Sequence, residues 1–222
     1  MTSVASHVRL WTFAAVGLAL DLWSKDWAFR EFRPNESRVI IKNLCSFQLS
    51  LNPGALFGLG EGAAPVFVGA SVLALLFVLY LFAQSPASRW SMHVALGLVL
   101  AGAIGNLYDR TTQHAYVFYS EQGRRIGTLV NSTESTITVG DFPTGANAIT
   151  RPKPTDEYSG VQPVVRDFIK IEAKIGAFEL WPWIFNIADA LLVVGVGVLL
   201  IHFWGERSQQ VPQDAAAEAP AV

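Results

Sequence analysis

The chain has 222 residues, and only 15% of them are charged, whereas soluble domains usually carry about 25%. Hydrophobic residues make up 51% of the chain, which excludes a disordered protein. The formal net charge of −2 provides no overall positive field, so we expect no nucleic-acid partner. One cysteine, Cys45, cannot form a disulfide within the chain. The composition indicates a membrane protein.

Four stretches with few charged residues predict membrane-spanning helices, because an ionised side chain in the middle of a bilayer costs about 2.5–3.5 kcal/mol on insertion scales. These helices are expected near residues 10–29, 64–83, 91–108 and 183–204. The first begins after Arg9, as a signal peptide would, but it runs directly into Asp21, Lys25 and Asp26 instead of small residues. We therefore expect it to be retained as an anchor.

The segments outside the helices differ in pattern. Residues 45–51 alternate between apolar and polar side chains, which predicts a half-buried strand at the membrane surface. Residues 111–160 are polar and interrupted by prolines, and the alternation near Ile137 and Val139 predicts a small hairpin within an extracytoplasmic insertion. We expect this insertion to form an added surface element outside the bilayer.

These elements predict an integral membrane protein of mainly α class. Its expected architecture is a bundle of four transmembrane helices over residues 1–207, with a small extracytoplasmic β element and the long polar insertion. Residues 208–222 are rich in Ala, Pro and Glu and are expected to form a disordered cytoplasmic tail.

The number of helices places both termini on the same side of the membrane. Three basic residues in the N-terminus, a short loop and the tail indicate that this side is cytoplasmic: Arg9, Arg89 and Arg207. Four others follow the first helix and oppose that orientation: Arg30, Arg33, Arg38 and Lys42.

Four polar clusters lie within or beside the apolar helices. They are Asp21 with Lys25, the segment from Asn52 to Gly58, the segment from Gly102 to Arg110, and the segment from Phe185 to Asp189. Threading the chain through four helices brings all four clusters to one leaflet, where they predict a single polar site.

Each cluster also has a structural explanation. Asp21 and Lys25 are four residues apart and can neutralise each other, Gly102 and Gly105 allow close helix packing, and Asp109 with Arg110 can form an interfacial ion pair. Asp189 lies several residues inside an apolar helix with no neighbouring cation in the sequence. This position favours a functional role.

At these clusters the sequence strongly resembles the lipoprotein signal peptidases, the signal peptidase II family of bacterial aspartic endopeptidases. Five family motifs occur in order: Asp21 with Lys25, Asn52-Pro-Gly54-Ala-Leu-Phe57, Gly105-Asn-Leu-Tyr-Asp109-Arg110, Val165-Arg-Asp167-Phe168 and Phe185-Asn-Ile-Ala-Asp189. The resemblance covers the chain except for about residues 111–160 and the tail.

The resemblance implies that Asp167 and Asp189 are the catalytic pair. Two carboxylates held close together do not both ionise readily, so one can activate water while the other acts as general acid. The resemblance further implies that five residues bind substrate: Asn52, Gly54, Asn106, Arg110 and Asn186. Asp21, Lys25 and Asp109 are expected to support the site.

The resemblance also implies the biology of the protein. The substrates would be diacylglyceryl-modified prolipoproteins, cut before the lipidated cysteine at the outer leaflet of the bacterial inner membrane. Membrane lipid and inhibitors of the globomycin type are further expected partners. We expect a monomer that needs neither a metal ion nor an organic cofactor.

The long insertion creates a second candidate for the first catalytic acid. Val139-Gly-Asp141-Phe142 matches the Val-x-Asp-Phe pattern as well. Asp167 is preferred because apolar residues surround it and because it lies nearer to Asp189 in the chain.

Three other function classes stay open at the sequence level. A proton-coupled transporter would use Asp21, Asp109 and Asp189 as a relay, but all three fall at one end of their helices. A non-catalytic binding protein would tolerate the loss of either acid. A Cys/His peptidase would use Cys45 and His114, although a lone cysteine in a strand is more often a packed apolar residue.

Overall fold

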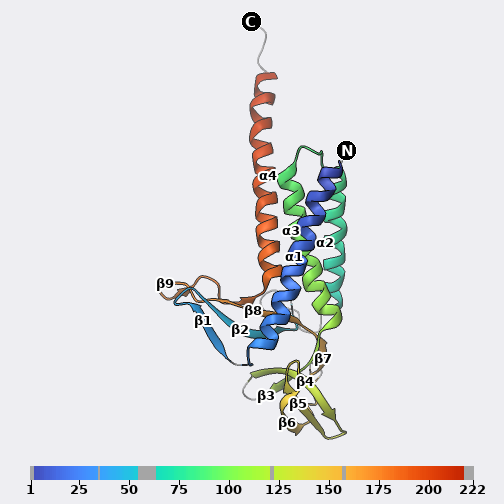
Figure 1. Ribbon diagram of the computed structural model, residues 1–222, viewed down its shortest axis with the longest axis vertical. Coiled ribbons are helices and arrows are strands. Elements are labelled where there is room, and N and C mark those ends of the chain that lie inside the picture. Colours follow the sequence, from blue (N-terminus) through green and yellow to red (C-terminus); the bar gives the residue numbers. More distant parts are fainter. Residues whose placement is uncertain (1–2, 35, 55–63, 121–122, 157–158, 218–222) are drawn as a thin grey trace.

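The fold was analysed from a computed structural model, which describes residues 3–34, 36–54, 64–120, 123–156 and 159–217. Its helices lie side by side, and its strands gather at one end of them (Figure 1). Both chain termini lie toward the opposite end (Figure 1). The described residues form four helices: α1 (Val4–Glu31), α2 (Ala64–Gln84), α3 (Trp90–Thr112) and α4 (Ile187–Ala217).

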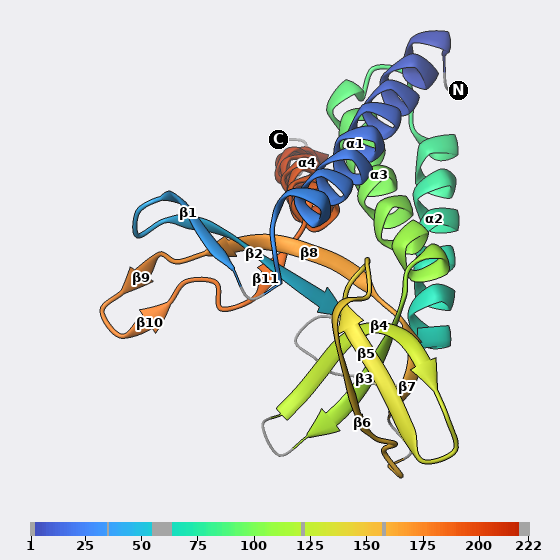
Figure 2. The ribbon, with the colours of Figure 1, turned by 60° about the horizontal axis from the view of Figure 1, so that its bottom comes forward.

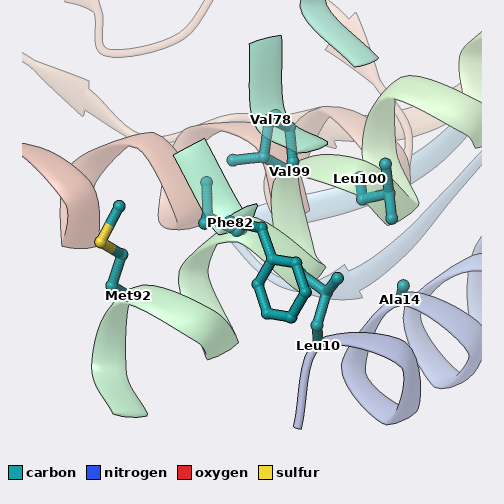
Figure 3. Packing of buried hydrophobic residues seen from close by; sticks show 8 residues of the cluster. Leu10, Ala14, Val78, Phe82, Met92, Val99 and Leu100 are labelled. Atoms are coloured by element: carbon teal, nitrogen blue, oxygen red, sulfur yellow. The ribbon is translucent and has the colours of Figure 1, made fainter. Parts of the chain in front are cut away.

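Helix α3 is the centre of the helical part, because it contacts α1, α2 and α4. Helix α1 begins at a capping box in which Ser3 and Ser6 each accept a backbone N–H. Its buried residues recur every three or four positions and so form one stripe. An apolar core joins α1, α2 and α3 (Figure 3): Leu10, Ala14, Val78, Phe82, Met92, Leu96, Val99 and Leu100.

The outward faces of the helices are also apolar. Trp11 on α1, Leu73 on α2 and Leu200 on α4 each have at least half of their surface exposed in the isolated chain, at 50%, 68% and 65%. Large apolar side chains on the outside of a helix are stable where lipid rather than water surrounds it. The helical part therefore has the surface of a membrane protein.

A four-stranded antiparallel sheet crosses beneath the helix ends (Figure 2). Its strands follow the order β1 (Ser37–Ile41), β2 (Cys45–Asn52), β8 (Val165–Ile171) and β11 (Ile184–Phe185). An aromatic cluster of Phe29, Phe32, Phe47 and Phe168 packs this sheet against the end of α1. In the β2–β8 register Ser50 lies opposite Asp167.

Two further sheets complete the fold. The larger has five strands in the order β6 (Ala146–Pro152), β5 (Thr136–Asp141), β4 (Gly123–Ser132), β3 (His114–Ser120) and β7 (Gly160–Pro163). Buried Tyr116, Phe118 and Ile137 form its own small core. The smaller is a two-stranded hairpin of β9 (Lys174–Ile175) and β10 (Phe178–Glu179).

The predicted fold class, a mainly α bundle of four transmembrane helices, is wrong. The described residues contain eleven strands in three antiparallel sheets. Only α3 and residues Ile187–Gly205 of α4 are long and apolar enough to span a membrane among the described residues. The described apolar part of α2 is the shorter Val68–Gln84, and α1 contains Arg9, Asp21, Lys25 and Asp26.

Two local predictions also need correction. The insertion is not a small hairpin, because residues 111–160 supply β3, β4, β5, β6 and the start of β7. Alternation was too weak to reveal these strands, because several of their residues are exposed on both faces of the sheet. The expected disordered tail begins inside α4, which continues to Ala217, and residues 218–222 lie outside the described residues.

Candidate active site

Asp167 lies in the middle of the four-stranded sheet, where β8 runs between β2 and β11. Asp167 is only 2% exposed. One carboxylate oxygen, Oδ1, accepts a hydrogen bond from Asn186 Nδ2 at 2.7 Å, and Oδ2 accepts one from Asn52 Nδ2 at 3.3 Å. Two amide side chains from different elements therefore orient this carboxylate.

Asp189 lies in the first turn of α4. Its Oδ1 accepts a hydrogen bond from Asn106 Nδ2 of α3 at 2.7 Å, and its Oδ2 accepts one from the backbone N–H of Asn186 at 3.2 Å. Asn186 Oδ1 in turn accepts the backbone N–H of Asp189 at 3.0 Å. This reciprocal cap ties the start of α4 to the carboxylate.

Asn186 connects the two acids. The residue is fully buried, and its Nδ2 donates to Asp167 Oδ1 while its backbone N–H donates to Asp189 Oδ2. The same Nδ2 also lies 3.1 Å from Asn106 Oδ1. The carboxylates of β8 and α4 are therefore held in one hydrogen-bonded group, although they come from separate parts of the fold.

The environment of Asp167 favours a protonated carboxyl group. Burial, and after it the charge of Asp189, raises the pKa of Asp167 well above its ordinary value. The hydrogen bond from Asn186, the charge of Lys25 and the hydrogen bond from Asn52 act in the opposite direction. A raised pKa on one of two neighbouring carboxyl groups is the arrangement that general acid and base catalysis uses.

A cavity of about 760 Å³, which we call the aspartate cavity, opens onto both acids. Its size lies within the range of ligand-binding pockets. Its polar lining residues are Ser50, Asn52, Ser71, Asn106, Arg110, Arg124, Asp167 and Asp189. Apolar lining residues come from α2, α4 and the β10–β11 segment and include Ala70, Ala74, Trp181, Trp183, Phe185, Leu192 and Val193. The cavity suits a ligand with a polar part at the acids and an apolar part along the helices.

Arg110 and Gly54 come together at the polar side of the aspartate cavity. Arg110 Nη2 donates to the carbonyl oxygen of Gly54 at 2.7 Å, and Asn52 Oδ1 accepts the backbone N–H of Gly54 at 3.1 Å. The structure therefore brings all five predicted substrate-binding residues to the neighbourhood of the acids. Phe57 of the same motif lies outside the described residues.

The three predicted supporting residues form a buried ionic group. Lys25 Nζ lies 2.8 Å from Asp21 Oδ2 and 3.5 Å from Asp109 Oδ2, and all three side chains are fully buried. Lys25 also donates to Asn106 Oδ1 at 3.1 Å, and Asp21 Oδ1 accepts the backbone N–H of Ala188 at 2.8 Å. These contacts link the ionic group to Asn106 and to the start of α4.

The predicted packing role of two glycines is confirmed. A Cβ atom on Gly105 would lie 2.4 Å from Asp21 Oδ2, and one on Gly102 would lie 2.4 Å from the carbonyl oxygen of Ala188. Larger residues there would push α3 away from α1 and α4. Glycine is therefore required for the close approach that lets Asn106 reach Asp189.

Sequence reasoning missed Arg166, which precedes Asp167 in β8. Its side chain is 7% exposed, and its Nη2 lies 2.8 Å from Asp109 Oδ1. Its backbone N–H donates to Asp109 Oδ2 at 3.0 Å, and its Nη1 lies 2.5 Å from Asp26 Oδ1. Counting the expected buried charges would have predicted a second cation, because Lys25 alone cannot neutralise two buried acids, Asp21 and Asp109.

Asp141, the second candidate for the first catalytic acid, lies elsewhere. It ends β5 in the five-stranded sheet, and its Oδ2 accepts a hydrogen bond from Asn147 Nδ2 at 2.8 Å. It lines a different cavity and does not line the aspartate cavity. Of the two candidate acids, Asp167 is therefore the one that shares a hydrogen-bonding partner, Asn186, with Asp189.

Cys45 has the surroundings of a structural cysteine. It begins β2 opposite Ile171, whereas Asn52 ends that strand beside Asp167. Burial, reinforced by the negative charge of Glu172, raises the pKa of the Cys45 thiol and disfavours the nucleophilic thiolate. Among the described residues, no group of three or more His, Cys, Asp or Glu side chains is arranged to hold a metal ion.

The family model for signal peptidase (SPase) II matches residues 13–205, which include every residue of the site described above. The chain belongs to the signal peptidase II family. The match confirms the resemblance and the expected class of enzyme, an aspartic endopeptidase. It excludes the transporter and the Cys/His peptidase as alternatives.

Individual relatives agree with this assignment. The lipoprotein signal peptidase of Desulfitobacterium hafniense is 27% identical over 192 residues, which cover 86% of this chain and 90% of the relative. That of Rhodopirellula baltica is 34% identical over 85% of this chain and 68% of the relative. A solved bacterial membrane enzyme shares the fold with a TM-score of 0.60 at 22% identity, over 89% of this chain and 88% of that one.

Proposed function

We propose that this peptidase removes the signal peptide from diacylglyceryl-modified prolipoproteins, with Asp167 and Asp189 as its catalytic groups. The family assignment and the names of the curated relatives support the substrate class. The observation that carries the assignment of the catalytic groups is the double contact of Asn186, whose side-chain amide donates to Asp167 and whose backbone N–H donates to Asp189, beside one cavity that both acids line.

The chemistry requires one protonated and one ionised carboxyl group. The raised pKa of Asp167 favours it as the proton carrier, and Asp189 then acts as general base. Asp189 takes a proton from water, and the resulting hydroxide attacks the carbonyl carbon before the lipidated cysteine. Asp167 gives its proton to the carbonyl oxygen as the tetrahedral intermediate forms.

The intermediate collapses when the carbon–nitrogen bond breaks. The nitrogen of the cysteine receives the proton that Asp189 took from water, and the hydroxyl proton of the intermediate returns to Asp167. The products are the free carboxyl group of the signal peptide and the free amino group of the lipidated cysteine. Asn52, Asn106 and Arg110 are placed to hydrogen-bond the peptide backbone during these steps.

The apolar side of the aspartate cavity supports recognition of the acyl chains. Side chains of α2 and α4, including Ala74, Leu192 and Val193, continue the cavity along the helices. Each methylene group buried there contributes about 0.8 kcal/mol. We therefore expect lipidation to affect cleavage more strongly than the sequence of the signal peptide does.

The arrangement of the chain supports an outer-leaflet site. Both termini lie toward one end of the helices, and the acids lie with the strands at the other (Figure 1). If both chain termini are cytoplasmic, the two acids face the outer surface of the bacterial inner membrane. Inhibition by globomycin and a monomeric state remain predictions.

A single-turnover assay in detergent tests the proposal. Lipidated and unlipidated forms of one precursor are incubated with excess enzyme, and precursor and product are separated on a gel. We expect rapid cleavage of the lipidated form and little of the other. Equal rates for the two forms would contradict a lipoprotein substrate, and an active Asp189→Asn protein would contradict the aspartate mechanism.

A further inference from the structure

A second cavity, of about 490 Å³, lies between the five-stranded sheet and the four-stranded sheet. We call it the arginine cavity. Alternate residues of two neighbouring strands line it: Ile137, Val139 and Asp141 of β5, and Asn147, Ile149 and Arg151 of β6. Because side chains two positions apart share a face of a strand, one face of the insertion forms this wall. The opposite wall is mostly apolar: Phe29, Leu49, Leu51 and Phe142.

The lining of the arginine cavity is positively charged. Three arginines, Arg124, Arg125 and Arg151, contribute to it, and all three are exposed. Asp141 is the one acidic residue among the lining residues. Among the lining residues that the structure describes, guanidinium groups thus outnumber carboxylates by three to one, which favours a ligand that carries negative charge.

The arginine cavity and the aspartate cavity are neighbours. Ser50, Leu51 and Arg124 line both of them. Ser50 lies directly opposite Asp167 in the β2–β8 register. An extended polypeptide bound at the acids can therefore continue past Ser50, Leu51 and Arg124 into the arginine cavity.

The position of the insertion limits which part of a substrate can reach it. The five-stranded sheet lies beyond the helix ends, on the far side from both termini (Figures 1 and 2). A signal peptide stays among the membrane-facing parts of the molecule, because it is apolar. The chain that follows the cleaved bond is the part that leads away from the membrane, past the insertion.

We propose that the arginine cavity is a subsite for the polypeptide that follows the lipidated cysteine, and that it favours segments with acidic side chains. The inference rests on the proposed function, because it assigns a second contact to the same substrate. The insertion thereby selects among lipoproteins by the charge of their first mature residues, while the acids perform the same cleavage on all of them.

Two matched precursors test this selectivity. Both are lipidated, and they differ only in that several Glu residues after the cysteine are replaced by Gln. We expect the wild-type enzyme to cleave the Glu precursor with a KM about 3- to 10-fold lower, at an equal kcat, because exposed ion pairs are individually weak. Equal KM values for the two precursors would overturn the proposal.

Variants of the cavity should remove the preference and not the chemistry. The double variant Arg125→Gln, Arg151→Gln is expected to cleave both precursors with the KM of the Gln precursor. Asp141→Asn removes the opposing negative charge, so it should lower the KM of the Glu precursor further. Lys153→Gln is the matched control, because Lys153 is an exposed cation of the insertion that lines neither cavity. A Lys153 effect equal to that of the double variant would show a general charge effect instead of a subsite.

A lipid headgroup is the competing source of negative charge. The assay is therefore repeated in vesicles of neutral lipid and in vesicles with added phosphatidylglycerol. A preference that is equal in both supports the polypeptide subsite. If the double variant loses the preference for the Glu precursor only in vesicles with phosphatidylglycerol, the cavity binds lipid, and the proposal is overturned. Failure of the wild-type enzyme to cleave either lipidated precursor would instead contradict the proposed function.

Discussion

Two segments of the chain share the pattern Val-x-Asp-Phe, and the fold gives them different surroundings. Asp167 lies in a central strand, 2% exposed and hydrogen-bonded by Asn186 and Asn52. Asp141 lies at the end of β5, half-buried, with Asn147 as a partner. The comparison teaches that the four-residue pattern does not determine chemistry by itself. Burial, and a second carboxylate that is hydrogen-bonded to the same residue, Asn186, distinguish the first segment.

The largest expected difference between the two segments is in catalysis. Asp167→Asn should lower the single-turnover rate by roughly 1000-fold or more, because an amide cannot donate or accept the transferred proton. Asp141→Asn should retain the wild-type kcat. Cleavage of a lipidated precursor, measured with folded protein of each variant, checks both. An inactive Asp141→Asn protein beside an active Asp167→Asn protein would reverse the assignment.

The residue before each acid also differs, since Arg166 corresponds to Gly140 in the other segment. Arg166→Gln should lower the free energy of unfolding by roughly 3–5 kcal/mol, because it leaves Asp109 buried without this cation. It should also lower kcat more than it changes KM, since Arg166 directly precedes Asp167 in β8 and does not line the aspartate cavity. Unfolding titrations in detergent and steady-state kinetics measure the two effects.

Arg30→Gln is the matched control for Arg166→Gln. Arg30 also pairs with Asp26, at 3.7 Å, but its side chain is 80% exposed. Its loss should change the free energy of unfolding by no more than about 0.5 kcal/mol. Arg166→Lys should restore part of the lost kcat. A stable, fully active Arg166→Gln protein would mean that Asp109 is satisfied without it.

Replacing the phenylalanine should also destabilise the protein more in the Asp167 segment than in the Asp141 segment. Phe168 is 2% exposed and contacts Phe47, so Phe168→Ala should cost about 3–5 kcal/mol of unfolding free energy. Phe142 is half-buried and packs edge-on against Phe29 at a centroid distance of 6.0 Å. Phe142→Ala should cost roughly 1–2 kcal/mol. The same unfolding titration compares them, and equal losses would show that the insertion is as firmly packed as the central sheet.

The smallest expected effect is a shift in the pH profile. Because the pKa of Asp167 is raised, this group keeps its proton until the pH rises through that pKa, and activity should fall above it. The Asn52 hydrogen bond stabilises the charged form and so lowers the pKa. Asn52→Ala should therefore move the alkaline limb of kcat to higher pH. A limb that stays in place or moves to lower pH would contradict Asp167 as the proton carrier.

The sequence by itself predicted the features that depend on residues close to one another in the chain. Each of the four predicted helical stretches overlaps an observed helix, because low charge and apolar composition are properties of a continuous stretch, but α1 begins at Val4 and α4 runs over Ile187–Ala217 instead of 183–204. The pairing of Asp21 with Lys25 followed from their spacing of four, which places them on one face of a helix. The motifs located Asp167 and Asp189 without any knowledge of how β8 approaches α4.

The tertiary structure determined the features that depend on contacts between distant segments. The five-stranded sheet forms by pairing strands whose individual patterns are weak, so no single stretch of residues 111–160 predicts it. Arg166 gained its role only when β8 was placed against Asp109 and Asp26. Asn186 likewise joins the two acids because a strand and a helix start meet at its side chain. Local spacing identifies the chemical groups, whereas burial and long-range pairing determine which of them act together.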